Sequence, residues 1–130
     1  MAKTVLVVDD DLDQRNYLAT VLDSAGLQVQ VAENGESGMA KVRQGPPALV
    51  TLDVMMPKES GVRMYRELKA DPELSRIPVL IISGLAQKTF LHTQGALDQK
   101  EGAETPPPDG YIEKPAEPEE LLAEVKRLMG

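Results

Sequence analysis

Short apolar runs alternate with amphipathic segments along most of the chain. Three of the runs are continuous and rich in Val, Leu and Ile, which is typical of strands buried on both faces of a sheet; they span residues 4–8, 48–52 and 78–82. Alternating Leu, Val and Gln over 27–31 indicate an outer strand, and 111–112 is a short fifth candidate. The pattern therefore predicts five strands.

The segments between the strands carry apolar side chains at helical spacing and are mostly bounded by Gly or Pro. They predict five helices, which lie at about 13–25, 35–44, 61–70, 88–100 and 117–128. The stretch 102–109 contains three successive prolines, cannot continue a helix, and is expected to form an exposed, extended loop. Strands that alternate with helices require right-handed crossovers, so the predicted fold class is α/β, a doubly wound parallel sheet covered on both faces.

Composition narrows the class of protein. A length of 130 residues suits one domain over 1–130, too short for a second output domain within it. The chain has no Cys, which excludes disulfides and cysteine nucleophiles and is compatible with the cytoplasm. A formal charge of −7 disfavours direct binding to nucleic acid, and no segment resembles a membrane span or signal peptide. Cations and other proteins are the expected partners.

Polar residues follow the predicted strands directly. They are Asp9, Asp10, Asp53, Ser83 and Lys114. Because the carboxyl ends of parallel strands meet at one edge, we expect these side chains to lie together. Clustered carboxylates repel one another unless a cation neutralises them, and Mg²⁺ prefers such oxygen ligands. A Lys ammonium and a Ser hydroxyl suit phosphoryl oxygens, so the cluster predicts phosphoryl transfer.

Within this cluster Asp53 is the best candidate nucleophile, because it stands alone on its strand. Asp9 and Asp10 form a pair that is better suited to holding the ion and its waters. Each residue taken singly also has an ordinary structural explanation: strand-end Asp residues commonly cap helices, and an isolated Lys114 would be a solvated charge. The prediction of a site rests on their joint occurrence.

Four motifs resemble those of a response regulator receiver domain. They are Val-Leu-Val-Val-Asp-Asp at 5–10, Leu-Asp-Val-Met-Met-Pro at 52–57, Ile-Ile-Ser-Gly at 81–84 and Tyr-Ile-Glu-Lys-Pro at 111–115. Each motif is weak alone, but the four occur in order and each closes its own strand. The resemblance covers nearly the whole chain and implies a flavodoxin-like fold with strand order 2-1-3-4-5.

The resemblance also implies a role for each site residue. Asp53 would be the phosphoacceptor of a two-component system, becoming 4-aspartylphosphate with the aid of Mg²⁺. Asp10 would be the main acidic ligand to the ion, with Asp9 assisting through water, Asp53 itself contributing, and Met55 binding through its backbone carbonyl. Further residues complete the machinery: the phosphoryl group would be contacted by Ser83 and Lys114, and the aromatic switch, which turns inward when Ser83 moves, would be Tyr111.

A receiver domain is not an enzyme in the ordinary sense. It would accept its phosphoryl group from a histidine kinase or phosphotransfer protein and signal through the face formed by the fourth helix, fifth strand and fifth helix. The output would be docking of a downstream protein or of a second copy of the chain. Met55 and Leu85 put apolar side chains where other receivers often carry polar groups that guide water, so we expect slow self-dephosphorylation.

Two other functions remain open from the sequence. One is a receiver-like binding module that works without phosphorylation, using the stretch 83–114, which is longer than usual for the family. The other is a haloacid-dehalogenase-like phosphatase, which also has an acid after its first strand, a later Ser and a downstream Lys. That family needs a further acidic strand end after the Lys, and it would leave Asp53 without a role.

Overall fold

A computed structural model describes residues 3–130, so the first two residues of the expected domain lie outside the described range. The chain forms one sheet of five parallel strands in the order β2-β1-β3-β4-β5, which confirms the predicted fold class and strand order. The strands are β1 (Thr4–Val8), β2 (Gln28–Ala32), β3 (Leu49–Leu52), β4 (Val79–Ser83) and β5 (Gly110–Glu113).

Four helices connect the strands and a fifth follows β5, all close to the predicted positions. They are α1 (Leu12–Ser24), α2 (Gly35–Gln44), α3 (Ser60–Ala70), α4 (Gln87–Glu101) and α5 (Pro118–Met129). Two single-turn 3₁₀ helices that the pattern did not predict precede α3 and β4, at Pro57–Glu59 and Leu74–Arg76. Within residues 3–130, no helix combines the length and the apolar character that a membrane crossing requires.

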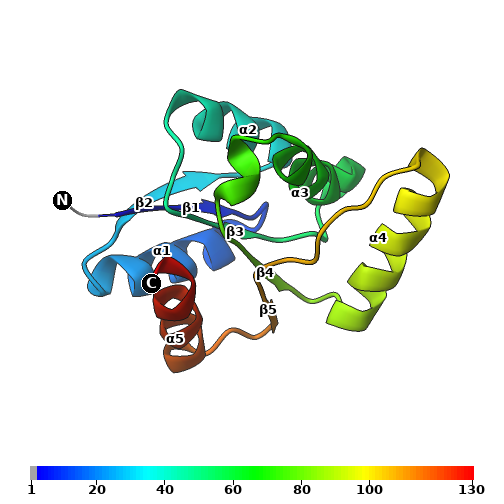
Figure 1. The fold of residues 1–130 in the computed structure, drawn as a ribbon. Helices are drawn as coiled ribbons and strands as arrows, with labels where there is room; N and C mark the ends of the chain where they lie inside the picture. The colour runs from blue at the N-terminus through cyan, green and yellow to red at the C-terminus, as the bar shows by residue number, and fades with distance from the viewer. Residues whose placement is uncertain (1–2) are drawn as a thin grey trace.

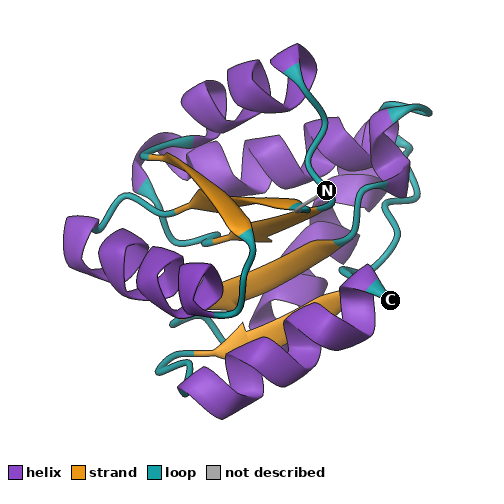
Figure 2. Cartoon of the chain, turned by 90° about the vertical axis from the view of Figure 1, so that its left-hand side faces the viewer, coloured by secondary structure: helices purple, strands orange, loops and turns teal. Residues whose placement is uncertain are grey.

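The helices cover the two faces of the sheet and produce two cores (Figures 1 and 2). α1 and α5 lie on one face, where Leu18, Leu22 and Leu121 are buried. α2, α3 and α4 lie on the other, where Tyr65 and Phe90 are among the largest fully buried side chains. Successive residues of the central strands point to opposite faces, so each strand contributes to both cores and is almost entirely apolar, with Thr51 and Ser83 as the buried polar residues.

The register of the central strands determines where the polar strand ends meet. Val8 of β1 lies opposite Leu52 of β3, so the next residues, Asp9 and Asp53, leave the sheet at the same level. On the other side of β4, Ser83 pairs with Glu113 of β5, which places Lys114 just beyond it. The carboxyl edge of the sheet therefore gathers the predicted site residues.

The stretch between α4 and β5 contains neither helix nor strand, as the prolines predicted. α4 ends at Glu101 and is capped by Gly102, whose φ of +67° is a left-handed conformation that glycine adopts without strain. The chain then runs extended from Gly102 to Asp109, mostly exposed, and returns to the sheet at β5 (Figure 1). We call residues 102–109 the proline segment.

Candidate functional site

Three carboxylates meet at the carboxyl edge of the sheet. Oxygen atoms of Asp9, Asp10 and Asp53 lie within 4.8 Å of one another. Asp9 and Asp53 are 1% and 5% exposed, whereas Asp10 is exposed to solvent. Burying two carboxylates so close together is unfavourable unless positive charge compensates them. The cluster predicted from the strand ends is thus present, and its three carboxylates lie close enough together to bind one cation.

Part of that positive charge comes from Lys114. Its Nζ donates to Asp9 Oδ2 and to Asp53 Oδ2, at 3.0 Å in each case. Burial lowers the pKa of Lys114, but the hydrogen bonds to Asp53 and Asp9 outweigh burial, so the pKa lies above its usual value. Lys114 therefore remains a cation that bridges the two buried acids.

The backbone fixes the side chain of Asp53. The Met55 N–H donates to Asp53 Oδ1 at 2.8 Å, while Oδ2 accepts from Lys114. The Asp53 N–H donates to the Val8 carbonyl at 3.0 Å, which continues the β1–β3 ladder up to the site. Each oxygen of the carboxylate therefore has one donor and retains capacity for a further partner.

Asp9 is fixed in a similar way from the start of α1. Its Oδ1 accepts from the Asp11 N–H at 2.9 Å, and its carbonyl accepts from the Arg15 guanidinium at 2.8 Å. Burial raises the pKa of the Asp9 carboxyl, outweighing the hydrogen bonds from Asp11 and Lys114 that lower it. Ionised Asp9 is thus costly in the absence of further positive charge.

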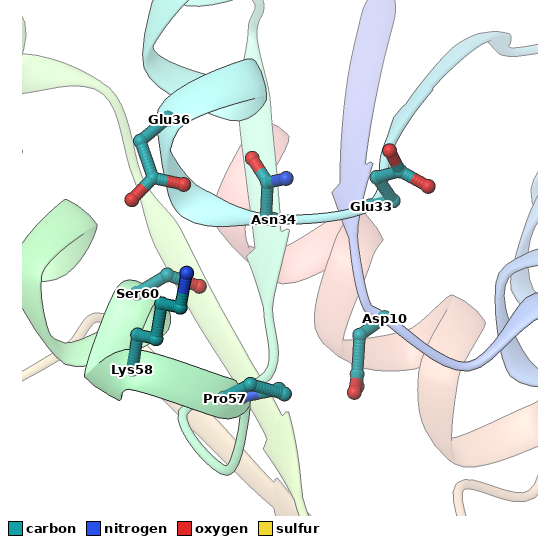
Figure 3. Close-up of a pocket in the computed structure, with 7 residues that line it drawn as sticks. All are labelled: Asp10, Glu33, Asn34, Glu36, Pro57, Lys58 and Ser60. Carbon is teal, nitrogen blue, oxygen red and sulfur yellow. The ribbon is translucent and has the colours of Figure 1, made fainter.

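Asp10 forms one wall of a hollow of about 300 Å³ at the edge of the cluster. Figure 3 shows Asp10 on one side of this hollow and Pro57, Lys58 and Ser60 across from it, with more acidic and polar side chains from the β2–α2 turn and the first turn of α2. These are Glu33, Asn34 and Glu36. The Asp10 side of the cluster is therefore open to solvent and mainly acidic, which allows a cation to enter.

Ser83 and Tyr111 are connected through the turn after β4. Ser83 is fully buried, and its Oγ accepts from the Leu85 N–H at 3.2 Å. The hydroxyl of Tyr111 donates to the Leu85 carbonyl at 2.6 Å. Burial, with the charges of Glu113 and Asp53, raises the pKa of Tyr111 to about 12. The ring is half-buried and packs on the core, so in this structure Tyr111 already lies against the turn that follows Ser83.

Three residues around the site were not predicted from the sequence. Arg15 holds the Asp9 carbonyl, and the Tyr17 hydroxyl donates to the Ala116 carbonyl at 2.7 Å, two residues beyond Lys114. Gly61 lies so close to β3 that a Cβ would be 2.1 Å from the Asp53 carbonyl oxygen. A glycine in the first turn of a helix, where it is unfavourable, was the available signal for that close approach.

The residues present fit a hard divalent cation. The cluster offers only oxygen donors, two or three carboxylates and nearby backbone carbonyls, which is the ligand set of Mg²⁺. Lys114 contacts Asp53 Oδ2 at 3.0 Å and adds a compact point charge. A carboxylate that is oriented by such a contact can act as a nucleophile toward a phosphoryl group.

Comparisons with known proteins agree with this geometry. Residues 5–126 match the family model of the response regulator receiver domain. The chain is 34% identical to the protein PilH of Pseudomonas aeruginosa over 128 residues, which cover 96% of both chains. It is also 34% identical to the phosphate regulon transcriptional regulatory protein PhoB of the same organism, but spans only 52% of that protein.

Solved structures give the same result. The signal receiver domain of a histidine kinase from Syntrophus aciditrophicus superposes with a TM-score of 0.81 at 30% identity, covering 98% of this chain and 90% of that one. A putative response regulator from Chloroflexus aurantiacus superposes with a TM-score of 0.79 at 27% identity, covering 99% and 98% of the two chains. Similar domains thus occur alone, in regulators and in kinases.

Proposed function

The chain belongs to the response regulator receiver domain family of two-component systems, and we propose that it accepts a phosphoryl group on Asp53. The observation that carries the proposal is the Lys114 ammonium, which lies 3.0 Å from Asp53 Oδ2 while the Met55 N–H binds Oδ1. These contacts orient the carboxylate and leave it beside the open, acidic hollow at Asp10. We propose residues 1–130 as a single receiver domain.

The transfer needs only the carboxylate, a donor and balanced charge. An oxygen of Asp53 attacks phosphorus, the bond from phosphorus to the donor breaks, and the donor leaves with the electron pair. A histidine kinase or phosphotransfer protein is the proposed physiological donor. In the product, Lys114 and the hydroxyl of Ser83 would hold phosphoryl oxygens, and Lys114 would exchange its contact with Asp53 for one with the phosphoryl group.

We propose that Asp10, Asp9 and Asp53 hold Mg²⁺, together with the backbone carbonyl of Met55. When bound, the ion would neutralise charge on the phosphoryl oxygens as transfer proceeds. The protein's own contribution is to keep the acid pair in register with Asp53 through the β1–β3 ladder. Arg15 supports the same arrangement from α1.

Phosphorylation would act on a two-state surface. Movement of Ser83 toward the new charge would break its bond to the Leu85 N–H and disturb the Tyr111 hydroxyl on the Leu85 carbonyl. Tyr111 is already packed against the core, so the proposed switch is a change of this contact rather than a first inward turn. The readout is the face of α4, β5 and α5, recognised in the cytoplasm by another protein or by a second copy.

The test is phosphorylation by a small molecule. The protein is incubated with acetyl phosphate and Mg²⁺, and its intact mass is recorded; we expect an increase of about 80 Da, one phosphoryl group. Asp53→Asn should show no increase, whereas Asp23→Asn, an exposed acid on α1, should behave as the wild type. No adduct on the folded wild type would refute the proposal and favour a binding module that works without phosphorylation. Steady release of inorganic phosphate from varied phosphate esters would instead favour a phosphatase.

A further inference from the structure

The proline segment is fastened to the body of the domain through α3 and α4. The Thr105 N–H and hydroxyl both donate to Asp98, at 2.9 and 2.6 Å, and Asp98 in turn pairs with Arg66 of α3 at 2.9 Å. One residue further, the carbonyl of Pro106 accepts from the Tyr65 hydroxyl at 2.5 Å. The segment is thus held in one position, although most of its residues are exposed.

Tyr65 is also the end of a row of aromatic rings. Its ring meets Phe90 edge-on, with centroids 5.4 Å apart and planes at 80°, and Phe90 lies 5.9 Å from the ring of Tyr111. Tyr65 and Phe90 are 0% and 1% exposed, so neither ring can move without displacing its neighbours. The row runs from the proposed switch tyrosine, across the core beneath α4, to the proline segment.

The hydroxyls at the two ends connect this row to backbone on either side. At the Tyr111 end the hydroxyl binds the Leu85 carbonyl, and the N–H of the same residue binds Ser83 Oγ. At the Tyr65 end the hydroxyl binds the carbonyl of Pro106. Leaving a buried hydroxyl without its hydrogen-bond partner costs about 1–3 kcal/mol. Each tyrosine at an end of the row therefore tends to move with the backbone carbonyl that its hydroxyl binds.

We propose that the row Tyr111–Phe90–Tyr65 couples the state of Asp53 to the conformation of the proline segment. This rests on the proposed function, because the signal begins with movement of Ser83 toward a phosphoryl group. Displacement of the Leu85 turn shifts Tyr111, Phe90 repacks between its two neighbours, and Tyr65 changes its contact with Pro106. Phosphorylation then changes the surface on the α3 side of α4, which lies outside the face of α4, β5 and α5.

A competing route runs through α4 itself. If α4 moved as a rigid body, Asp98 would carry Thr105 with it whatever the rings did. The two routes differ at Phe90. Replacing its ring with an aliphatic side chain breaks the aromatic row but leaves Asp98, Arg66 and Thr105 in place.

The experiment uses ¹⁵N-labelled protein with Mg²⁺ and beryllofluoride, which mimics a phosphoryl group on a carboxylate. Prolines have no N–H, so the amides of Thr105 and Asp109, on either side of the three prolines, report on the segment. The amide of Met55, which binds Asp53, reports on the site. In the wild type we expect all three resonances to shift together as beryllofluoride is added.

In Phe90→Leu we expect the Met55 resonance to shift as before, while the shifts of Thr105 and Asp109 fall to less than about half of the wild-type values. Leu22→Val, a loss of buried volume in the core on the other face of the sheet, is the matched control and should retain the full response. Tyr65→Phe, which removes only the hydroxyl, should change the dissociation constant of beryllofluoride by about fivefold, because coupling between two sites is reciprocal.

The results separate the inference from the proposed function. Thr105 and Asp109 resonances that stay fixed in the wild type while Met55 shifts, or that shift equally in Phe90→Leu, would overturn the coupling and leave phosphorylation of Asp53 standing. A Met55 resonance that does not respond to saturating beryllofluoride would overturn both.

Discussion

The Nζ of Lys114 lies 3.0 Å from Asp53 Oδ2, and an equal contact with Asp9 makes this ammonium the bridge between two buried acids. Lys114→Met should therefore lower the free energy of unfolding by about 1–3 kcal/mol in Mg²⁺-free buffer, because it leaves buried acceptors without a partner. Urea unfolding with and without Mg²⁺ measures this, and Mg²⁺ should restore more stability to the variant than to the wild type.

Lys126→Met is the matched control for Lys114→Met. Lys126 is exposed on α5, and its loss should leave the urea midpoint nearly unchanged. If Lys114→Met were as stable as the wild type without Mg²⁺, the bridge would contribute nothing to the fold, and Lys114 would not compensate the charges of Asp9 and Asp53.

Mg²⁺ should stabilise the folded domain through the exposed member of the acid cluster. A ligand that binds only the native state adds about 2.7 kcal/mol at a concentration of 100 times its dissociation constant. Asp10→Asn should strongly reduce this stabilisation by Mg²⁺. Without Mg²⁺ the variant should unfold at a higher temperature than the wild type, because it removes one of three mutually repelling charges. Thermal unfolding over a Mg²⁺ titration measures both effects.

Asp23→Asn provides the comparison for Asp10→Asn, since this α1 acid is exposed and lies outside the acid cluster. It should respond to Mg²⁺ as the wild type does. An unchanged Mg²⁺ response in Asp10→Asn would exclude that side chain as a ligand.

Much of the site could be predicted from the sequence because parallel strands bring their carboxyl ends to one edge. The apolar runs identify β1 and β3, and the strand order 2-1-3-4-5 implied by the receiver resemblance makes them adjacent. Asp9 and Asp53 are then neighbours, and the same order places Ser83 beside Lys114. No precise side-chain geometry is needed for this conclusion. The two 3₁₀ turns escaped prediction because each is a single turn, too short to show helical periodicity, although Pro57 begins the first and Asp71 accepts hydrogen bonds before the second. Lys58 within the first also adopts a φ of +59°, which is rare for a side-chain-bearing residue.

The contacts that support the site depend on how the helices cross, which periodicity does not specify. The sequence pattern predicts Tyr17 only as part of the apolar stripe of α1, yet its hydroxyl donates a hydrogen bond to the loop after Lys114. Similarly, the prolines predict an extended loop but not its attachment to Tyr65, which lies 41 residues earlier in the chain. Long-range polar contacts of this kind appear only when the packed structure is known.

Gly61 should be essential for the shape of the phosphoacceptor strand. A Cβ there would be 2.1 Å from the Asp53 carbonyl oxygen, so Gly61→Ala should cost at least about 1–3 kcal/mol by overpacking and should slow phosphorylation of Asp53. Gly95→Ala in α4 is the control: no atom lies within 4 Å of its added Cβ, and alanine should stabilise the helix by about 0.5–1 kcal/mol. Chemical unfolding and the acetyl phosphate reaction test both variants.

Equal stability of Gly61→Ala and Gly95→Ala would contradict the close approach of α3 to β3. A Gly61→Ala protein that unfolds at a lower denaturant concentration but is phosphorylated at the wild-type rate would mean that the contact supports only the fold.

Asp98 should make the proline segment sensitive to acid. The hydrogen bonds from the Thr105 hydroxyl and N–H, followed by Arg66, lower the pKa of Asp98 below its ordinary value of 3.8. Since the ionised form is favoured in the folded state, this stabilisation is complete above pH 3.8 and is lost as the pH falls through the lower, folded value. Thr105→Val should therefore be less stable than the wild type at neutral pH, and the difference should shrink on acidification.

Urea unfolding from pH 7 down to pH 3 measures the trend, with Thr93→Val as control. Thr93 is an exposed residue of α4, the helix that carries Asp98. Its replacement should change the free energy of unfolding only slightly and by an amount that does not depend on pH. A Thr105→Val difference that stays constant over the whole range would show that Asp98 does not titrate with this contact.

Met55 is the residue through which the lifetime of the phosphorylated state can be tested. Its side chain is 56% exposed beside Asp53, and its sulfur lies 3.7 Å from where a Cβ on Gly84 would stand, at the mouth of the site. Leu85, the other apolar residue here, is half-buried and packs on the core. The exposed thioether offers no strong hydrogen bond to an attacking water molecule.

Met55→Gln should therefore shorten the lifetime of phosphorylated Asp53 by about tenfold, below the roughly 10²–10⁴-fold effect of a positioned general acid or base, because an amide can orient water but hardly deprotonate it. The decay of the phosphorylated mass after removal of acetyl phosphate measures the lifetime. Val31→Gln, an apolar-to-polar change at a 38% exposed position on β2, should leave it unchanged. A wild-type lifetime of only seconds, or a Met55→Gln lifetime equal to that of the wild type, would show that apolar cover at this position does not protect the phosphoryl group.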